Sequence, residues 1–90
     1  MNRVLRLNDG DDVAVALEPL EPGARIDLDG VDVLAREAVP AGHKIALRAI
    51  ATGEAVQKHG AAIGIASQPI AQGDYVHVHN LESTRLRGDR

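Results

Sequence analysis

The residues of this sequence that best suit the binding of a metal ion or an anion are two histidines two positions apart. They are His77 and His79, in the stretch GDYVHVHNLES at residues 73–83. Side chains two apart on an extended strand share a face, so both imidazoles should point one way while Val76 and Val78 point toward the core. Such a face could hold a metal ion or contact an anion, or it could be a solvent-facing polar stripe. The residues alone leave these interpretations open.

Basic residues next to glycine turns are the second kind of candidate. His43 and Lys44 follow a glycine, where a turn could present a cation to a carboxylate, because lysine is a compact charge on a flexible stem. Lys58 and His59 precede another glycine and could act in the same way, although turns are often polar without any role in binding. Asn80, directly after the histidine pair, is interpreted as a hydrogen-bonding residue that ends the strand.

An acidic run near the N-terminus resembles a cation-binding loop in part. Asp9, Asp11 and Asp12 are closely spaced, but the remaining ligands of a calcium loop are missing. We therefore interpret the run as a turn. The sequence contains no Ser/His/Asp order, phosphate-binding glycine loop or convincing pair of carboxylates, so a self-sufficient active site is not expected.

The composition limits the partners of the chain. Its 90 residues suit one domain, and a single tyrosine is its only aromatic residue, which argues against stacking on bases or sugars. The net charge of −3 argues against nucleic acid as a partner. Without cysteine there are no disulfides or thiolate ligands, and no apolar run is long enough for a signal peptide or a membrane helix. We expect a cytoplasmic domain without membrane contact.

The dominant hydrophobic period is two, which predicts a mainly β fold. Turn residues such as those in NDGDD and in the Asp29-Gly30 pair separate the alternating runs and predict two hairpins. The expected hairpin strands are residues 3–7 with 13–17 and residues 24–28 with 31–35.

A motif of the form apolar-x-x-Gly-x-x-apolar recurs four times. Each copy predicts a β-corner, in which glycine adopts a turn conformation that other residues resist and a new strand begins three residues later. The spacing is too irregular for a solenoid and favours a folded-over, internally paired β unit. The copies are LEPGARI (20–26), VPAGHKI (39–45), IATGEAV (50–56) and IAQGDYV (70–76).

Three further stretches lie between and after the corners. Residues 61–70 predict a short buried strand in which Gly64 allows a close approach of backbone or partner. Residues 44–56 have an apolar spacing that allows one short helical turn. Residues 83–90 lack periodicity and are expected to be a tail or the start of a linker, so the domain is predicted to span residues 1–82.

Residues 40–81 resemble the SAF-type β-clip domain at the N-terminus of the altronate and galactarate dehydratase family. The resemblance is carried by GHKIAL, by G-x-x-V-x-K-x-G-x-x-I-G and by the closing G-x-x-V-H-V-H-N-L, which together cover nearly half of the chain. The preceding segment resembles the same domain more loosely. His59 departs from the pattern, because the family has an aromatic residue there, usually tyrosine.

The resemblance implies a small β-clip fold with at most one or two short helical turns. It also implies a small subunit or N-terminal domain that is inactive alone and caps the active site of a large catalytic subunit acting on a sugar acid. A divalent metal, iron or manganese, is implied in the assembled enzyme, and His43, His77 and His79 are candidate ligands, with the last two preferred. Two imidazoles cannot fill the shell of a metal, so further ligands would come from elsewhere.

Two other functions stay open. The alpha subunit of a (2R)-sulfolactate sulfo-lyase resembles the same two-part layout and eliminates sulfite rather than water. A stand-alone β-clip module that binds carbohydrate is the alternative from a non-catalytic class. The sequence also leaves open the identity of the acid, the metal and whether the chain forms a homo-oligomer.

Overall fold

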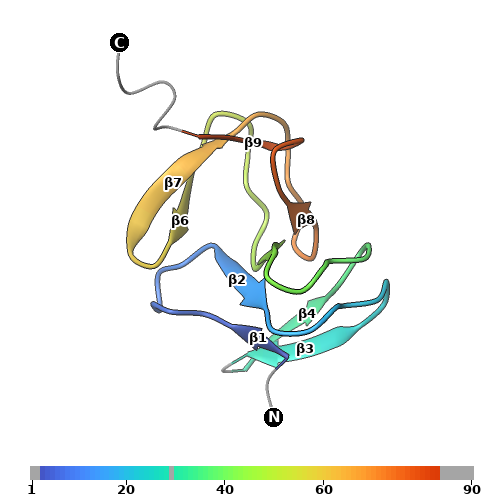
Figure 1. Ribbon diagram of the computed structural model, residues 1–90. Helices are drawn as coiled ribbons and strands as arrows, with labels where there is room; N and C mark the ends of the chain where they lie inside the picture. Colours follow the sequence, from blue (N-terminus) through green and yellow to red (C-terminus); the bar gives the residue numbers. More distant parts are fainter. Residues whose placement is uncertain (1–2, 29, 84–90) are drawn as a thin grey trace.

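The computed structural model describes residues 3–28 and 30–83 (Figure 1). This part of the chain consists of short β-strands joined by turns, which confirms the mainly β fold. It contains no helix, and so none that could span a membrane. The strands are β1 (Val4–Leu5), β2 (Val13–Ala16), β3 (Arg25–Leu28), β4 (Val31–Leu34), β5 (Lys44–Ala46), β6 (Ala55–Lys58), β7 (Ala61–Ala66), β8 (Tyr75–Val76) and β9 (Leu81–Ser83).

The strands pair into three antiparallel sheets. The central sheet has the order β1-β2-β5-β8 and joins segments that are far apart in the sequence. The β3–β4 hairpin lies at one end of the molecule, and the β6–β7 hairpin, which β9 extends along β7, lies at the other (Figure 1). Both hairpins predicted from the sequence, β1–β2 and β3–β4, are confirmed.

The four glycine motifs form the predicted corners. Each motif glycine lies in a turn with a φ between +84° and +92°, a conformation that residues with a side chain resist. The corners also meet in pairs, because Leu20 bridges to Val39 and Ile50 bridges to Ile70. The corner glycines are Gly23, Gly42, Gly53 and Gly73.

The paired corners show that one structural unit occurs twice in the chain. We call residues 20–46 the first repeat and residues 50–76 the second repeat; each runs through a corner, a hairpin, a second corner and a strand of the central sheet. The same hydrogen bonds recur in both, which confirms an internally paired unit. The matching bonds include Gly23 N–H to the Ala35 carbonyl and Gly53 N–H to the Ala66 carbonyl, each 2.8 Å long.

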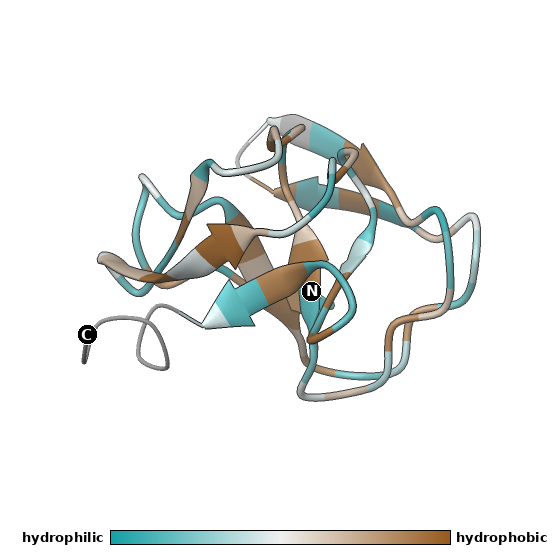
Figure 2. Cartoon of the chain, turned by 90° about the horizontal axis from the view of Figure 1, so that it is seen from above, coloured by the Kyte–Doolittle hydropathy of each residue, from teal (hydrophilic) through white to brown (hydrophobic). Residues whose placement is uncertain are grey.

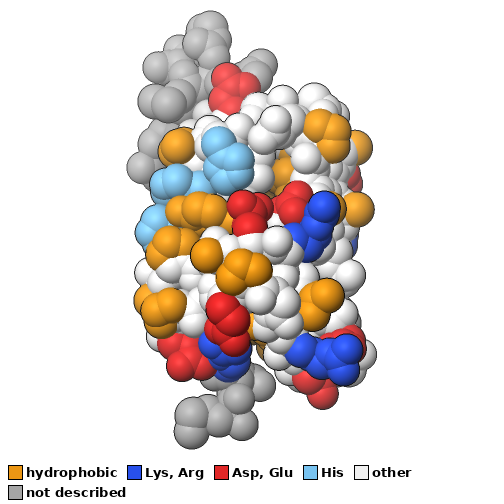
Figure 3. Space-filling model, turned by 90° about the vertical axis from the view of Figure 1, so that its right-hand side faces the viewer, with side chains coloured by type: hydrophobic (Ala, Val, Ile, Leu, Met, Phe, Trp, Pro, Cys, Tyr) orange, Lys and Arg blue, Asp and Glu red, His pale blue; other side chains and the backbone are white. Residues whose placement is uncertain are grey.

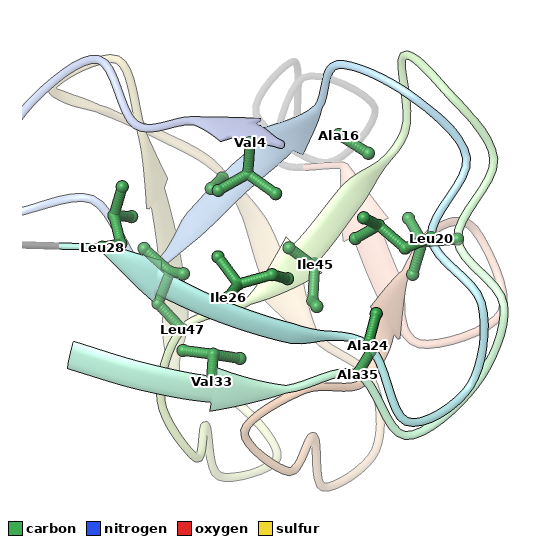
Figure 4. Packing of buried hydrophobic residues seen from close by; sticks show 12 residues of the cluster. Val4, Ala16, Leu20, Ala24, Ile26, Leu28, Val33, Ala35, Ile45 and Leu47 are labelled. Atoms are coloured by element: carbon green, nitrogen blue, oxygen red, sulfur yellow. The ribbon is translucent and has the colours of Figure 1, made fainter. Parts of the chain in front are cut away.

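Two hydrophobic cores lie against the central sheet. Neighbouring residues of β2 and β5 belong to different cores, with Ala14 and Ile45 in the first and Val13 and Ala46 in the second, because successive side chains in a strand point to opposite faces. The first core is closed by the β3–β4 hairpin (Figure 4) and the second by β6 and β7. Figure 2 shows hydrophobic residues in brown along several strands and hydrophilic residues in teal, many of them in the connecting turns.

The three remaining stretches differ in how well they match the sequence-based expectations. Residues 44–56 form β5, the Ile50 bridge and the start of β6, so the short helical turn allowed there is not formed. β7 is buried only in its second half, where a Cβ on Gly64 would come within 2.5 Å of the Glu82 carbonyl; the expected close approach is confirmed. Of the predicted tail, Ser83 ends β9 and residues 84–90 lie outside the described residues, so the boundary after residue 82 stays a prediction.

Candidate functional site

The strand predicted to carry the histidine pair ends before it. β8 stops at Val76 and the next four residues form a turn, so the expected alternation between two faces is wrong. Val78, expected in the core, is 80% exposed. The turn forms because the buried side chain of Asn80 takes the place of a neighbouring strand as hydrogen-bond partner of the backbone. Its Oδ1 accepts from the His77 N–H at 2.9 Å, and its Nδ2 donates to the Tyr75 carbonyl at 2.9 Å.

The turn nevertheless brings both imidazoles against one tyrosine. The Tyr75 and His77 rings stack with centroids 5.5 Å apart and an interplanar angle of 10°. His79 packs against the same tyrosine at 5.6 Å, and His43 lies 4.9 Å from His77. Tyr75 Oη and His43 Nδ1 share a hydrogen bond of 2.7 Å. We call these four side chains the ring cluster; histidines gather beside hydrophobic side chains on the face in Figure 3.

Tyr75 is the member of the ring cluster that the sequence analysis missed. It is the only aromatic residue of the chain and precedes His77 by two positions, the same spacing that singled out the histidines. His43 joins them because β5 pairs with β8 in a register that sets Ile45 opposite Tyr75. This pairing between distant segments was not visible in the sequence.

A cavity of about 620 Å³ lies next to the ring cluster. Lys44, at the start of β5, is half-buried in its wall. Partial burial, and then the positive charge of Lys58, lower the pKa of Lys44 below its ordinary value of 10.5. The cavity is lined by Lys44, Ser67, His77, Val78, Leu81, Glu82 and Ser83.

His77 belongs to both the ring cluster and the cavity wall. Its pKa lies below the ordinary value of 6.5 because of partial burial and, in decreasing order, the neighbouring charges of His43, Lys44 and His79. Its imidazole is therefore mainly neutral at neutral pH, when it can either donate or accept a proton. The histidines predicted as candidates do lie together, with Lys44 beside them.

Lys58 and His59 have different positions relative to this site. Lys58, at the end of β6, is close enough to Lys44 to influence its pKa. His59 and Gly60 instead form the two-residue turn between β6 and β7, with φ values of 57° and 76°. Among the described residues, His59 makes no ring contact with the ring cluster. Its position is explained by the hairpin turn.

The acidic run forms the turn expected from the sequence and also anchors this hairpin. The Asp11 carboxylate accepts backbone N–H bonds from His59 at 2.8 Å, from Gly60 at 3.0 Å and from Asn8 at 3.2 Å. Burial alone would raise the pKa of Asp11, but these three donors outweigh it and lower the pKa below 3.8. Asp12 is also buried, and its carboxylate binds Arg48 Nε at 2.7 Å. Both carboxylates are structural.

Comparison with known proteins gives this architecture a family. The family model described as "Altronate/galactarate dehydratase SAF domain" matches residues 2–84. The chain belongs to this family. The resemblance noted for residues 40–81 is therefore confirmed and extends over most of the chain.

Curated relatives of this SAF domain include two altronate dehydratases. The one from Bacillus subtilis is 35% identical over 83 residues, which are 92% of this chain and 17% of the relative. The one from Escherichia coli is 45% identical over 73 residues, or 81% of this chain and 15% of the relative. The chain thus spans about one sixth of their length. A (2R)-sulfolactate sulfo-lyase subunit alpha from Chromohalobacter salexigens is 46% identical over 50 residues, 56% of this chain and 53% of that subunit.

The described side chains of this SAF domain do not form a metal site by themselves. His43 Nδ1 is bonded to Tyr75, and His77 stacks on the tyrosine ring. Within residues 3–28 and 30–83 no group of three or more histidine, aspartate or glutamate side chains could hold a metal ion. The expected metal ligands His77 and His79 therefore stay a prediction. What the described side chains offer is the proton chemistry of imidazole and phenol groups and the positive charge of an ammonium group.

Proposed function

We propose that the chain is the small subunit or N-terminal part of a sugar-acid hydro-lyase of the altronate or galactarate type. It is inactive alone and caps the active site of a large catalytic part. The proposal rests on the match to the SAF domain over residues 2–84. It is supported by the small share, 15–17%, that this match takes of two altronate dehydratases.

The side chains of the site suit part of such a reaction. Elimination of water from a sugar acid needs a base for the proton next to the carboxylate, an acid for the leaving hydroxyl and stabilisation of the negative charge. In this chain, Tyr75 Oη and His43 Nδ1 can hold a proton between them, and Lys44 supplies a positive charge. The large part would provide the remaining groups, including any iron or manganese.

A grafting experiment tests the proposal. The segment matched by this chain is deleted from the Escherichia coli altronate dehydratase, and this chain is supplied in its place, either fused or as a separate polypeptide. We expect the truncated enzyme and the isolated chain each to lack dehydratase activity with altronate and galactarate, and the combination to form the 2-keto-3-deoxy acid. As a second combination, this chain is paired with the large catalytic part of its own enzyme, which we call the native pair. Turnover by the isolated chain would contradict the proposal, and so would a lack of activity in both the graft and the native pair.

Variants of the ring cluster sharpen this test. Replacing both His77 and His79 with alanine should leave the isolated domain folded, because both side chains are at least partly exposed and such truncations usually change stability within about 0.5 kcal/mol. The same variant should reduce turnover of the combined enzyme by about tenfold or more. Full turnover with a normal melting temperature would show that the histidines are only a solvated face.

A second candidate function follows from the sulfo-lyase relative. The matched 50 residues are 53% of that subunit, so it is about as long as this chain, whereas the two altronate dehydratases are about five times as long as this chain. The 46% identity over 50 residues supports the alpha subunit of a (2R)-sulfolactate sulfo-lyase as the second candidate. Release of sulfite from (2R)-sulfolactate by the native pair, without turnover of altronate or galactarate, would select this function. Binding of neutral carbohydrate without any turnover would select a stand-alone β-clip module.

A further inference from the structure

We infer that the cavity beside Lys44 is a carboxylate-binding site of this chain itself, and that it takes the acid group of a small hydroxy acid. The charges and geometry of the cavity favour an anion. The choice of a hydroxy acid as ligand rests on the proposed function.

Lys44 differs from five arginines in having no counter-ion within the described part of the chain. Each of those arginines has a carboxylate oxygen between 2.6 and 3.9 Å from its guanidinium group, whereas neither Lys44 nor Lys58 has one among the described residues. A half-buried ammonium group without a partner is unfavourable, and a bound carboxylate would offset its lost hydration. The paired arginines are Arg3, Arg6, Arg25, Arg36 and Arg48.

The surroundings of Lys44 add to the positive potential. Lys58 is close enough to Lys44 to add a second positive charge that no described carboxylate neutralises. The neutral imidazole of His77 in the cavity wall adds no charge, but it can donate a hydrogen bond to an anion. The carboxylate in the cavity wall is that of Glu82. Its negative charge would repel the acid group of a ligand, so the acid group should lie nearer to Lys44 than to Glu82.

The remaining walls suit a small polyhydroxylated molecule. The volume of about 620 Å³ lies within the roughly 300–1,000 Å³ of small-molecule sites. The hydroxyl of Ser67 is a polar group on one side, and Val78 and Leu81 offer apolar surface to the carbon chain. Val78 is 80% exposed although it borders the cavity, so its side chain is available to a ligand.

Titration of the isolated chain with matched ligands tests the site. Amide NMR spectra are recorded with galactarate, with succinate as an acid without hydroxyls, and with galactitol as a neutral polyol. We expect saturable shifts at Lys44, Ser67 and Leu81 with galactarate, weaker binding of succinate and no saturable binding of galactitol. Because the attraction is electrostatic, added salt should weaken the binding. Absence of saturable galactarate binding, or equal binding of galactitol, would overturn the inference.

Variants assign the binding to one side chain. Lys44→Gln should weaken galactarate binding by about tenfold or more, whereas Lys44→Arg keeps the charge and should retain most of it. Lys58→Gln is the matched control. It should weaken galactarate binding by less than about threefold, because this lysine lies outside the cavity wall. Dispersed amide spectra confirm that each variant is folded. Equal affinity of Lys44→Gln and the parent chain would refute the site.

The outcomes separate the carboxylate site from the proposed function. If the chain binds galactarate through Lys44 but neither the graft nor the native pair turns over, the proposed function fails and the carboxylate site stands. If the combined enzyme is active while Lys44→Gln binds galactarate normally, the site fails and the proposed function stands.

Discussion

The two repeats share a backbone but differ in what surrounds it. At the second corner of the first repeat, a Cβ on Gly42 would meet nothing within 4 Å, whereas at the equivalent corner of the second repeat a Cβ on Gly73 would collide with the Leu34 carbonyl. Both glycines have positive φ. One sequence motif can thus be required by backbone conformation alone in one place and by packing as well in another.

The strands that follow these two corners begin with different residues, and this difference forms the candidate site. β5 begins with Lys44 and β8 begins with Tyr75, at equivalent positions of the two repeats. Because β5 and β8 are neighbours in the central sheet, the cation of one repeat and the aromatic ring of the other lie near each other. The candidate site is therefore formed where the two repeats meet.

The largest expected effect is a difference in stability between alanine variants of the two equivalent corner glycines, Gly42 and Gly73. Gly73→Ala should destabilise the domain by more than about 4 kcal/mol, because the new methyl group would collide with backbone that cannot move freely. Gly42→Ala is the matched control and should cost only about 1–2 kcal/mol, the strain of a left-handed conformation. Urea denaturation measures both. Equal losses would show that the corners are equivalent after all.

A smaller effect is expected at the hairpin turns. The β6–β7 turn is held by the Asp11 carboxylate, whereas in the first repeat the Gly30 N–H bonds to Asp27 at 3.2 Å within its own hairpin. Asp11→Ala should therefore lower the free energy of unfolding by about 2–3 kcal/mol, because three backbone N–H groups lose hydrogen bonds to one charged, buried carboxylate. Urea denaturation again provides the measurement.

The control for this variant lies in the same turn. Asp9 is fully exposed, and its carboxylate lies 3.9 Å from the Arg6 guanidinium group, so Asp9→Ala should stay within about 0.5 kcal/mol of the parent. The stabilisation by Asp11 should also be present above about pH 4 and be lost as the pH falls through its lowered pKa. A similar loss in both variants would contradict the anchoring role of Asp11.

The smallest expected effect concerns the charge of Lys44 on its neighbour. NMR titration of His77 should give a midpoint below 6.5, and Lys44→Gln should move it upward, because a positive neighbour is removed. In the parent chain the folded state binds fewer protons than the unfolded state between the lowered pKa and 6.5. Stability should therefore decline as the pH falls through this window. If the titration midpoint of His77 is the same in Lys44→Gln as in the parent chain, the charge of Lys44 does not influence His77.

The sequence predicted the local features of the fold better than its long-range pairing. The corners and hairpins follow from glycine and turn residues that act within a few positions, as at Gly30 between β3 and β4. The end of β8 could not be predicted, because alternation suggested a strand while the side chain of Asn80 closes a turn. His43, Lys44 and His77 were found by residue type, but Tyr75 emerged only from the pairing of β5 with β8.

The assignment of Ile45 and Ala46 to opposite cores has a consequence for how the chain can be divided. β5 closes the first repeat, yet one of its faces completes the core of the second. If the chain were cut between the repeats, the first fragment would expose the apolar face of β5 that carries Ala46. The second fragment would lack the strand that covers this side of its core. The two repeats are thus not independent folding units, and we expect them to fold and unfold together in one cooperative transition.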